Sequence, residues 1–337
     1  MLKIQAKTWQ TSRFKELGRG GEAVVYRLKP DTVAKVFHRP DAPEFADNPQ
    51  LQEAARVRLV EMQTKLLDFP ADLPAQLVAP AGVLINPKRQ VFGYVMPFRE
   101  GTALDQFART TSILTTKLVA RLLCGLHDLV SALHKCGMVI GDFNENNVII
   151  DKKTPYLIDA DSMQFGKYQC RSFMPHFVAP ELVAADKNAN VPTPRQSVSR
   201  IPCPDCGSLT CISARTVGTP ARPSTRRARQ QTAINTSLQP QFQMVAPHTE
   251  TTDWYSFLVI AMRLSTFTGP FGGVVNGMDL AERLEKRVTV FDRRVVYPRV
   301  AQPLKKVPRP LLELFYRVFH LGERVVPDRE LFVALGT

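Results

Sequence analysis

Two short apolar runs, each followed directly by carboxylate or amide side chains, constrain the fold of this 337-residue chain most strongly. Residues 138–140 (MVI) lead into GDFNENN at 141–147, and residues 156–158 (YLI) lead into DAD at 159–161. Such runs predict β-strands, so both strand ends should deliver their polar side chains together. Oxygen ligands of this type suit Mg²⁺, and phosphoryl transfer also needs one carboxylate to orient the attacking hydroxyl. Three side chains provide this set: Asp142, Asn147 and Asp159.

A glycine-rich turn and a strand lysine lie upstream, in the order that a nucleotide site requires. The turn and the run after it contain Gly18, Gly20, Gly21 and Val25. Glycines let backbone N–H groups approach phosphates, and a strand lysine, here Lys35, can pair with the α- and β-phosphates. A buried lysine without an acidic or phosphate partner is costly. We expect the partner to be Glu53 or Glu61, on an amphipathic helix predicted over residues 50–67.

In this order the motifs resemble the protein-kinase superfamily, whose catalytic loop reads H-R-D-x-x-x-x-N and whose metal loop reads D-F-G. The resemblance implies that Asp142 is the catalytic base and that Lys35 contacts the phosphates of ATP. It also implies that Asn147 and Asp159 bind Mg²⁺ or Mn²⁺. Its implications therefore agree with those drawn from the residues alone.

The resemblance extends to the helix and to the strand that follows it. In kinases the paired glutamate lies about two turns before the proline-marked end of this helix region, so Pro70 favours Glu61 over Glu53. Residues 91–101 are similar to the last small-lobe strand and the hinge that holds adenine. The hinge groups would be the gatekeeper Met96, the carbonyl of Pro97 and the N–H of Arg99.

Several positions depart from the usual kinase motifs. Gly141 replaces an arginine, Asn144 replaces a lysine that meets the γ-phosphate, and Asp161 replaces the glycine of the metal loop. Without the arginine, a phosphorylated activation loop lacks its receptor, so we expect activity that does not depend on such phosphorylation. Asp161 has two interpretations, a second acidic group near Mg²⁺ or a side chain that caps the loop.

The patterns G-D-x-N-x-x-N and I-D-x-D-S are most similar to a bacterial group of atypical Ser/Thr kinases, in which these departures are normal. Members of this group often belong to cassettes with a von Willebrand A protein and a metal-dependent phosphatase. The resemblance therefore implies these two proteins as partners, besides the protein substrate. Ser162 and Ser172 are candidate phosphosites.

Segments downstream separate protein kinases from the aminoglycoside and choline kinases, which share G-D-x-x-x-x-N and I-D-x-D/E. Residues 177–181 (FVAPE) resemble the A-P-E end of an activation segment, and residues 253–257 (DWYSF) resemble the start of the large-lobe core helix. Glu181 should pair with Arg324 or Arg329. Because these elements support a peptide-binding surface in protein kinases, they favour a protein substrate.

The predicted fold is α+β and bilobal, like that of protein kinases. A small β-rich N-lobe would span residues 1–98 and a larger helical C-lobe residues 99–337, and the length suits two such units. The chain has neither an apolar run of 18 residues nor an N-terminal signal pattern, so we expect a cytoplasmic protein without a membrane segment. Its six cysteines lack the regular spacing of a secreted disulfide framework.

A basic segment, residues 186–248, is inserted into the predicted C-lobe. It has eight basic and two acidic residues, +6 of the chain's net charge of +13. Its composition, rich in Pro, Ser, Thr and Gln, cannot bury much apolar surface, and we interpret it as a tolerated surface loop or a site of autophosphorylation. A C-P-x-C-G turn suggests Zn²⁺, with bystander thiols as the alternative. The zinc ligands would be Cys203, Cys206 and Cys211, with Cys170, His176 or His248 as a fourth.

The basic balance, with a sequence pI of about 9.6, allows acidic partners, but no recognised nucleic-acid motif accompanies it, so nucleic-acid binding is not expected. The expected function is transfer of the γ-phosphate of ATP to Ser or Thr of a protein, including the chain itself. Two alternatives remain, a pseudokinase scaffold that binds nucleotide and a small-molecule phosphotransferase. A scaffold would not need to retain the four polar side chains of the site, which are Lys35, Asp142, Asn147 and Asp159.

Overall fold

The computed structural model describes residues 2–5, 13–109, 114–185 and 242–336. The α+β class is confirmed, because a β-rich sheet comes first and helices dominate later. One unit of the structure comprises Met1–Ala184 and Met244–Thr337, and a second comprises Ala185–Gln243. Most of the second unit lies outside the described residues, as does most of the predicted insertion.

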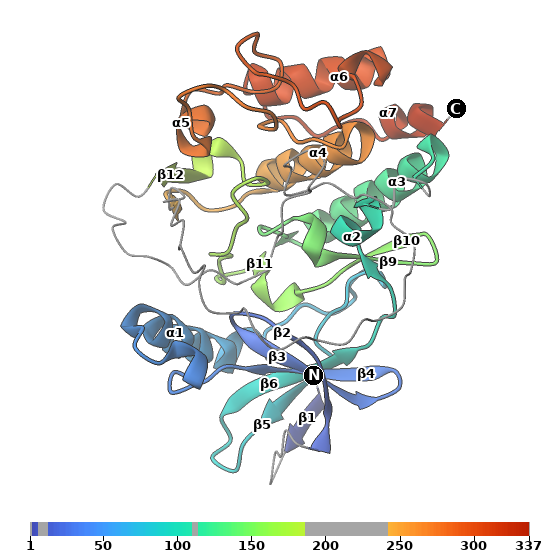
Figure 1. Ribbon diagram of the computed structural model, residues 1–337. Coiled ribbons are helices and arrows are strands. Elements are labelled where there is room, and N and C mark those ends of the chain that lie inside the picture. Colours follow the sequence, from blue (N-terminus) through green and yellow to red (C-terminus); the bar gives the residue numbers. More distant parts are fainter. Residues whose placement is uncertain (1, 6–12, 110–113, 186–241, 337) are drawn as a thin grey trace, which may run out of the picture. The chain divides into compact units, whose positions relative to one another are not determined.

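Six strands form the N-terminal sheet, in the order β1-β5-β6-β4-β3-β2 (Figure 1). Their bounds are β1 Leu2–Gln5, β2 Lys15–Arg19, β3 Ala23–Lys29, β4 Thr32–Phe37, β5 Gly82–Ile85 and β6 Val91–Pro97. β1 pairs with β5 in parallel and the other pairs are antiparallel. β4 and β6 approach closely at Gly93, where a Cβ would lie 2.4 Å from the carbonyl oxygen of Lys35. Glycine is therefore required in the middle of β6.

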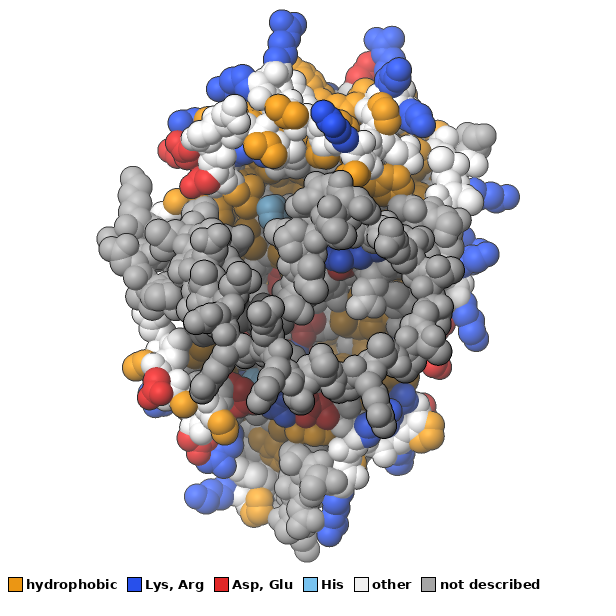
Figure 2. Space-filling model, in the orientation of Figure 1, with side chains coloured by type: hydrophobic (Ala, Val, Ile, Leu, Met, Phe, Trp, Pro, Cys, Tyr) orange, Lys and Arg blue, Asp and Glu red, His pale blue; other side chains and the backbone are white. Residues whose placement is uncertain are grey.

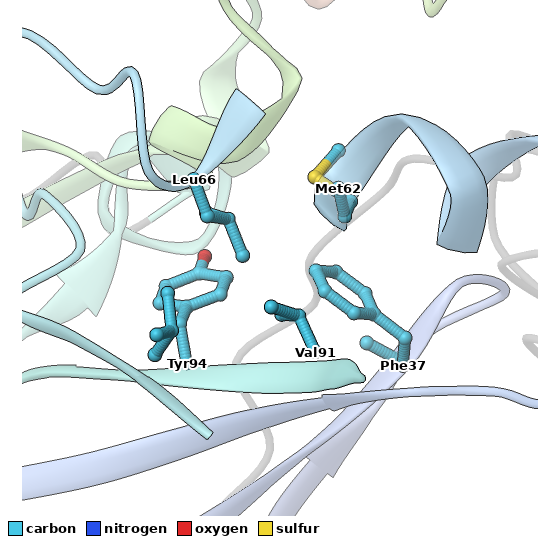
Figure 3. Close-up of a cluster of buried hydrophobic side chains, with 7 residues drawn as sticks. Phe37, Met62, Leu66, Val91 and Tyr94 are labelled. Carbon is cyan, nitrogen blue, oxygen red and sulfur yellow. The ribbon is translucent and has the colours of Figure 1, made fainter. Parts of the chain in front are cut away.

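Helix α1 (Pro49–Lys65) packs on this sheet and confirms a helix within residues 50–67, but the predicted amphipathic pattern is wrong, because Val57 and Val60 are exposed. Asn48 caps its N-terminus by accepting a hydrogen bond from a first-turn N–H at 3.1 Å, and a proline follows where no N–H is needed. Met62 and Leu66, at the end of the helix, are buried in the apolar cluster of Figure 3. Burial of this apolar side fixes how the helix is rotated against the sheet.

Two long helices that lie side by side form the core of the C-terminal part (Figure 1). α3 (Thr116–Lys135) follows the capping residue Thr115, and α4 (Glu250–Thr266) follows the capping residue Thr249. α4 is buried on nearly all sides, which explains its largely apolar sequence. The other α-helices are α2 Leu104–Arg109, α5 Leu280–Glu285, α6 Arg309–Phe315 and α7 Glu330–Val333. In the described parts of the chain, no helix combines the length and apolar character needed to cross a membrane.

Short strands position the two polar segments singled out in the sequence. β8 (Met138–Val139) pairs with β11 (Gln164–Phe165), and β9 (Val148–Asp151) pairs with β10 (Thr154–Leu157) and with β7 (Thr102–Ala103). Both apolar runs therefore contain strands, as predicted. Strands β12 (Val183–Ala185) and β13 (Phe242–Met244) precede and follow the undescribed segment in the sequence.

Candidate functional site

Lys35 occupies the middle of a row of three residues on adjacent strands. Val25 on β3 and Tyr94 on β6 are its direct cross-strand partners, and directly opposed residues point to the same face of a sheet. The buried Lys35 ammonium contacts the Asp159 carboxylate and donates a hydrogen bond to Asp161 Oδ1 at 2.8 Å. The strand lysine therefore meets the carboxylates that follow β10, 124 residues further along the chain.

The charges of this cluster stabilise one another. Burial alone would lower the pKa of Lys35, but the two carboxylates outweigh burial and raise that pKa. Burial likewise acts to raise the pKa of Asp159, but the contact with Lys35 lowers it overall. The lysine therefore stays positive and Asp159 stays negative at neutral pH. This pairing satisfies the requirement for burying a lysine.

The expectation that Glu61 holds Lys35 is wrong for this structure. Within the described residues, the ion pairs of Lys35 are with Asp159 and Asp161. Burial lowers the pKa of Lys65 on α1, and the Glu61 charge opposes that shift, so Glu61 acts on a different lysine. The physical reason is that the two carboxylates after β10 already pair with the Lys35 ammonium, while α1 contributes apolar side chains such as Met62 to the cluster on the sheet.

The glycine-rich turn joins β2 to β3 and is tied to β4 and α1. The His38 ring forms a hydrogen bond with the Gly20 carbonyl at 2.9 Å, and Glu22 in the turn pairs with Arg58 of α1. The Arg58 charge also contributes to the lowered pKa of Asp159. The glycines Gly18, Gly20 and Gly21 are exposed. α1 thus brings a guanidinium, in place of the expected carboxylate, to the edge of the site.

Asp159 has an uncommon backbone conformation. Its φ of 65° and ψ of 36° are left-handed, which costs a residue with a Cβ about 1–2 kcal/mol, although aspartate tolerates it better than most. Its carbonyl accepts hydrogen bonds from the Ser162 N–H at 3.1 Å and the Ser162 hydroxyl at 2.8 Å. Strained conformations of this kind persist where neighbours enforce them, and they cluster at functional sites.

Asp142 and Asn147 come together in the loop after β8. Asn147 Nδ2 donates to the Asp142 carbonyl at 2.9 Å, and the Ile158 N–H donates to the Asn147 carbonyl at 3.0 Å. Asn144 Nδ2 donates to Asp142 Oδ1 at 2.8 Å. Burial raises the pKa of Asp142 to about 6; the Asn144 bond opposes this shift, and the Asp159 charge adds to it. Such a carboxylate is suited to accept a proton near neutral pH.

The absence of an arginine before Asp142 has a steric reason. Gly141 has a φ of 74°, and a Cβ there would lie 2.5 Å from Cys170 Sγ. Burial raises the pKa of the Cys170 thiol to about 12, so this cysteine acts as an unreactive packing group. The loop has no room at this position for an arginine that receives a phosphate.

A buried carboxylate from α4 anchors the same loop. Asp253 accepts hydrogen bonds from the Ile140 N–H at 2.7 Å and the Gly141 N–H at 2.8 Å, and it contacts His134 Nε2 at 2.9 Å. Several hydrogen-bond donors to one buried carboxylate offset the free-energy cost of burying its charge. This interaction fixes the backbone directly before Asp142.

Glu181 pairs with one of its two predicted arginines. Arg324 Nε donates to Glu181 Oε1 at 2.6 Å, whereas Arg329 pairs with Asp128 at 2.7 Å. Burial would raise the pKa of Glu181, but the bonds and charge of Arg324 lower it overall. The segment that resembles A-P-E is thereby joined to a residue near the end of the chain.

The predicted hinge residues lie at the end of β6. Met96 packs against the cluster that contains Tyr94, and because these two residues are two positions apart on a strand, they share a face. Pro97 is exposed. The Arg99 guanidinium lies over the Tyr156 ring at 5.0 Å.

Asp161 has a role that neither of its two interpretations included. Its side chain is 1% exposed, and within the described residues its hydrogen bonds come from Lys35 Nζ and from the Tyr94 hydroxyl at 2.6 Å. A carboxylate enclosed in this way is the partner of the lysine rather than a loop cap.

Asp159 and Asn147 have oxygen atoms that suit an Mg²⁺ ion bound together with phosphates. The Asp159 side chain is 30% exposed and Asn147 is half-buried, so both present hard oxygen donors at an accessible edge. Mg²⁺ usually binds through one or two carboxylates together with substrate phosphates and water. Among the described residues, no group of three or more His, Cys, Asp or Glu side chains could hold a metal ion.

The predicted zinc ligands Cys203, Cys206 and Cys211 lie outside the described residues. Two of the suggested fourth ligands, Cys170 and His248, lie beside Gly141. The His248 ring contacts the Ser172 carbonyl at 3.1 Å. One ring nitrogen of His248 is therefore already engaged with the segment that follows β11.

On the face shown in Figure 2, the described Lys and Arg side chains lie at separate places among acidic and apolar ones. Independent of this view, the described ion pairs include those of Arg309 with the nearby Glu313 and of Arg294 with the nearby Asp292. The described part of this face therefore shows no continuous basic stripe.

Three contributions were missed by sequence reasoning, those of Tyr94, Asn144 and Arg58. In the sequence, Tyr94 lies in an apolar strand pattern like its neighbours. Its hydroxyl group is the feature that could have indicated a polar role. Asn144 is interpreted from the sequence as a replaced lysine and as a position of the G-D-x-N-x-x-N pattern, and neither interpretation gives it a role toward Asp142. Arg58 lies on a helix whose rotation was not known.

Comparison with protein-family models and with curated proteins finds no match for this chain. The functional argument therefore depends on the arrangement of the site itself.

Proposed function

We propose that the chain is an ATP-dependent protein kinase with a bilobal kinase-like fold, which transfers the γ-phosphate to Ser or Thr, including its own. The observation that carries the proposal is the contact of Lys35 with Asp159, beside the loop that holds Asp142 and Asn147. A lysine for phosphates, oxygen ligands for Mg²⁺ and a carboxylate with a pKa of about 6 are the groups that phosphoryl transfer requires.

Catalysis of this reaction depends mainly on positioning and charge. Lys35 would orient the α- and β-phosphates, and the N–H groups of the exposed glycine-rich turn would donate to phosphate oxygens. Asp159 and Asn147 would hold Mg²⁺ or Mn²⁺, whose positive charge would neutralise the phosphates. Asp142, oriented by Asn144, would accept the proton of the attacking hydroxyl.

Two features of the C-terminal part support a protein substrate. Arg324 holds Glu181 in the segment that resembles A-P-E, and Asp253 anchors the catalytic loop from α4. Protein kinases use both elements to support a peptide-binding surface. The von Willebrand A protein and the phosphatase are proposed as partners from motif resemblance alone.

The test is incorporation of label from ATP with Mg²⁺ or Mn²⁺ into the purified protein and a generic protein substrate. We expect label on Ser or Thr, reduced at least ~100-fold in Asp142→Asn and Asp159→Ala, because the first removes the base and the second a metal ligand. Asp128→Asn, which removes an exposed ion pair with Arg329, is the control and should transfer normally.

Two other outcomes would replace this proposal. Nucleotide binding without any transfer would identify a scaffold that senses nucleotide. Transfer to small alcohols or amines, but not to proteins, would identify a small-molecule phosphotransferase. Mapping the labelled residues also shows whether residues 186–248 are phosphorylated.

A further inference from the structure

Lys35 is held by a hydrogen-bonded group that includes a tyrosine. The Tyr94 hydroxyl donates to Asp161 Oδ1 at 2.6 Å, and the same oxygen accepts a hydrogen bond from Lys35 Nζ at 2.8 Å. Tyr94 and Lys35 are direct partners in the β4–β6 register. One buried carboxylate oxygen therefore links a phenol and an ammonium group that arise from adjacent strands.

We propose that Tyr94 is a positioning residue: its hydroxyl fixes Asp161, so that Asp161 and Asp159 together hold Lys35 for the phosphates of the nucleotide. This inference rests on the proposed function. It assigns to a strand tyrosine and a loop carboxylate the task that we expected of a glutamate on α1.

The Tyr94 ring is well placed to hold the hydroxyl still. It is fully buried in a cluster with Phe37, Met62 and Leu66, and the Phe37 ring lies 6.0 Å away (Figure 3). Tight packing leaves the ring one orientation, so the hydroxyl position is set before a ligand binds. α1 therefore acts on Lys35 through apolar contacts with Tyr94 rather than through a carboxylate of its own.

Asp161 depends on this hydroxyl because burial leaves it few other donors. Its side chain is 1% exposed, and within the described residues it accepts hydrogen bonds from Lys35 and Tyr94. A buried carboxylate that loses a donor bears the cost of an unsatisfied charge. Burial also raises the pKa of Tyr94 well above its ordinary value, so the phenol remains a donor at every working pH.

The experiment measures the reactivity of Lys35 toward acetic anhydride in the absence of nucleotide, by quantitative mass spectrometry of the Lys35 peptide. In wild type the buried, paired amine should react slowly. Tyr94→Phe keeps the ring and its packing but removes the hydroxyl, and we expect the rate of Lys35 acetylation to rise at least tenfold. Asp161→Asn is a second variant and should have the same effect.

Tyr297→Phe is the matched control, because it also loses one tyrosine hydrogen bond, to the Gln302 carbonyl at 2.7 Å, but outside the site. It should leave Lys35 as unreactive as in wild type. Unchanged reactivity in Tyr94→Phe or in Asp161→Asn overturns the proposal. A rise in Glu61→Gln with none in Tyr94→Phe also overturns it, and returns the role to the helix.

A fluorescent ATP analogue with Mg²⁺ then separates the two proposals. If wild type binds it, Tyr94→Phe should bind at least fivefold more weakly and Tyr297→Phe equally well. If Tyr94→Phe frees Lys35 but wild type does not bind the analogue, Tyr94 still holds Lys35, but the kinase proposal fails and with it the role of this hold toward nucleotide phosphates. If wild type binds and transfers phosphate while Tyr94→Phe matches it in both measurements, the positioning role fails and the kinase proposal stands.

Discussion

Asp142 and the amide that orients it determine the pH dependence of the proposed reaction. Because the raised pKa of Asp142 is about 6, the group carries a proton below that pH and cannot accept another. We expect kcat/KM for the Mg complex of ATP, which reports on the free enzyme, to rise with pH through about 6 and level off above.

Replacing Asn144 with Ala should move this acidic limb to higher pH. The variant removes a 2.8 Å hydrogen bond that favours the charged carboxylate. Such a bond contributes about 1.5 kcal/mol, which corresponds to about one pH unit. ATP titrates equally in both assays, so the difference between the two profiles belongs to the protein. Superimposable profiles would refute this role of Asn144.

Gly141 is a position where the addition of a single Cβ atom should reduce the stability of the protein. Gly141→Ala combines a left-handed φ of 74° with a Cβ placed 2.5 Å from Cys170 Sγ. Gly137→Ala has a similar φ of 70° but nothing within 4 Å, so it isolates the backbone cost of about 1–2 kcal/mol. We expect Gly141→Ala to lower the free energy of unfolding by about 1–3 kcal/mol more than Gly137→Ala, in urea denaturation. Equal losses of unfolding free energy in the two variants would show that the clash with Cys170 does not destabilise Gly141→Ala.

Helix α4 contributes more to the site than its apolar packing suggests. It carries Asp253, whose carboxylate receives two loop N–H groups and contacts His134. In Asp253→Asn the amide presents one acceptor oxygen and an NH₂ group where two acceptors are needed. We expect the free energy of unfolding to fall by about 2–3 kcal/mol and the loop amides to exchange with deuterium faster.

The control for this prediction is Asp128→Asn, which breaks an exposed pair with Arg329. Exposed pairs contribute about 0–1 kcal/mol, so the control should change little. If the two variants lose the same stability and exchange alike, α4 does not anchor the loop after β8 through Asp253.

Across the whole molecule, contacts between residues far apart in the sequence assemble the site. Lys35 and Asp159 are separated by 124 residues, Gly141 and Asp253 by 112, and Glu181 and Arg324 by 143. Each contact closes a long loop of chain, so its entropic cost must be offset by the cores on which it depends. The site therefore forms only when the N-terminal sheet and the C-terminal helices are both folded.

Local sequence patterns predict the secondary-structure elements of the candidate site and most of its polar groups. Apolar periodicity and flanking residues are local properties, so the strand that bears Lys35, the helix after it and the strands before Asp142 and Asp159 could be predicted. The predicted pairing of Glu181 with an arginine near the end of the chain is also confirmed, and the partner is Arg324.

Which polar groups contact one another depends on how the elements pack together in three dimensions. Lys35 pairs with Asp159 and Asp161 rather than with Glu61, and α1 contributes the buried Met62 to the cluster on the sheet. The strand register that sets Tyr94 opposite Lys35 is likewise a property of the whole sheet. A helix can present several carboxylates with equal periodicity, and a strand can slide by two residues without changing its pattern, so local sequence cannot choose between them.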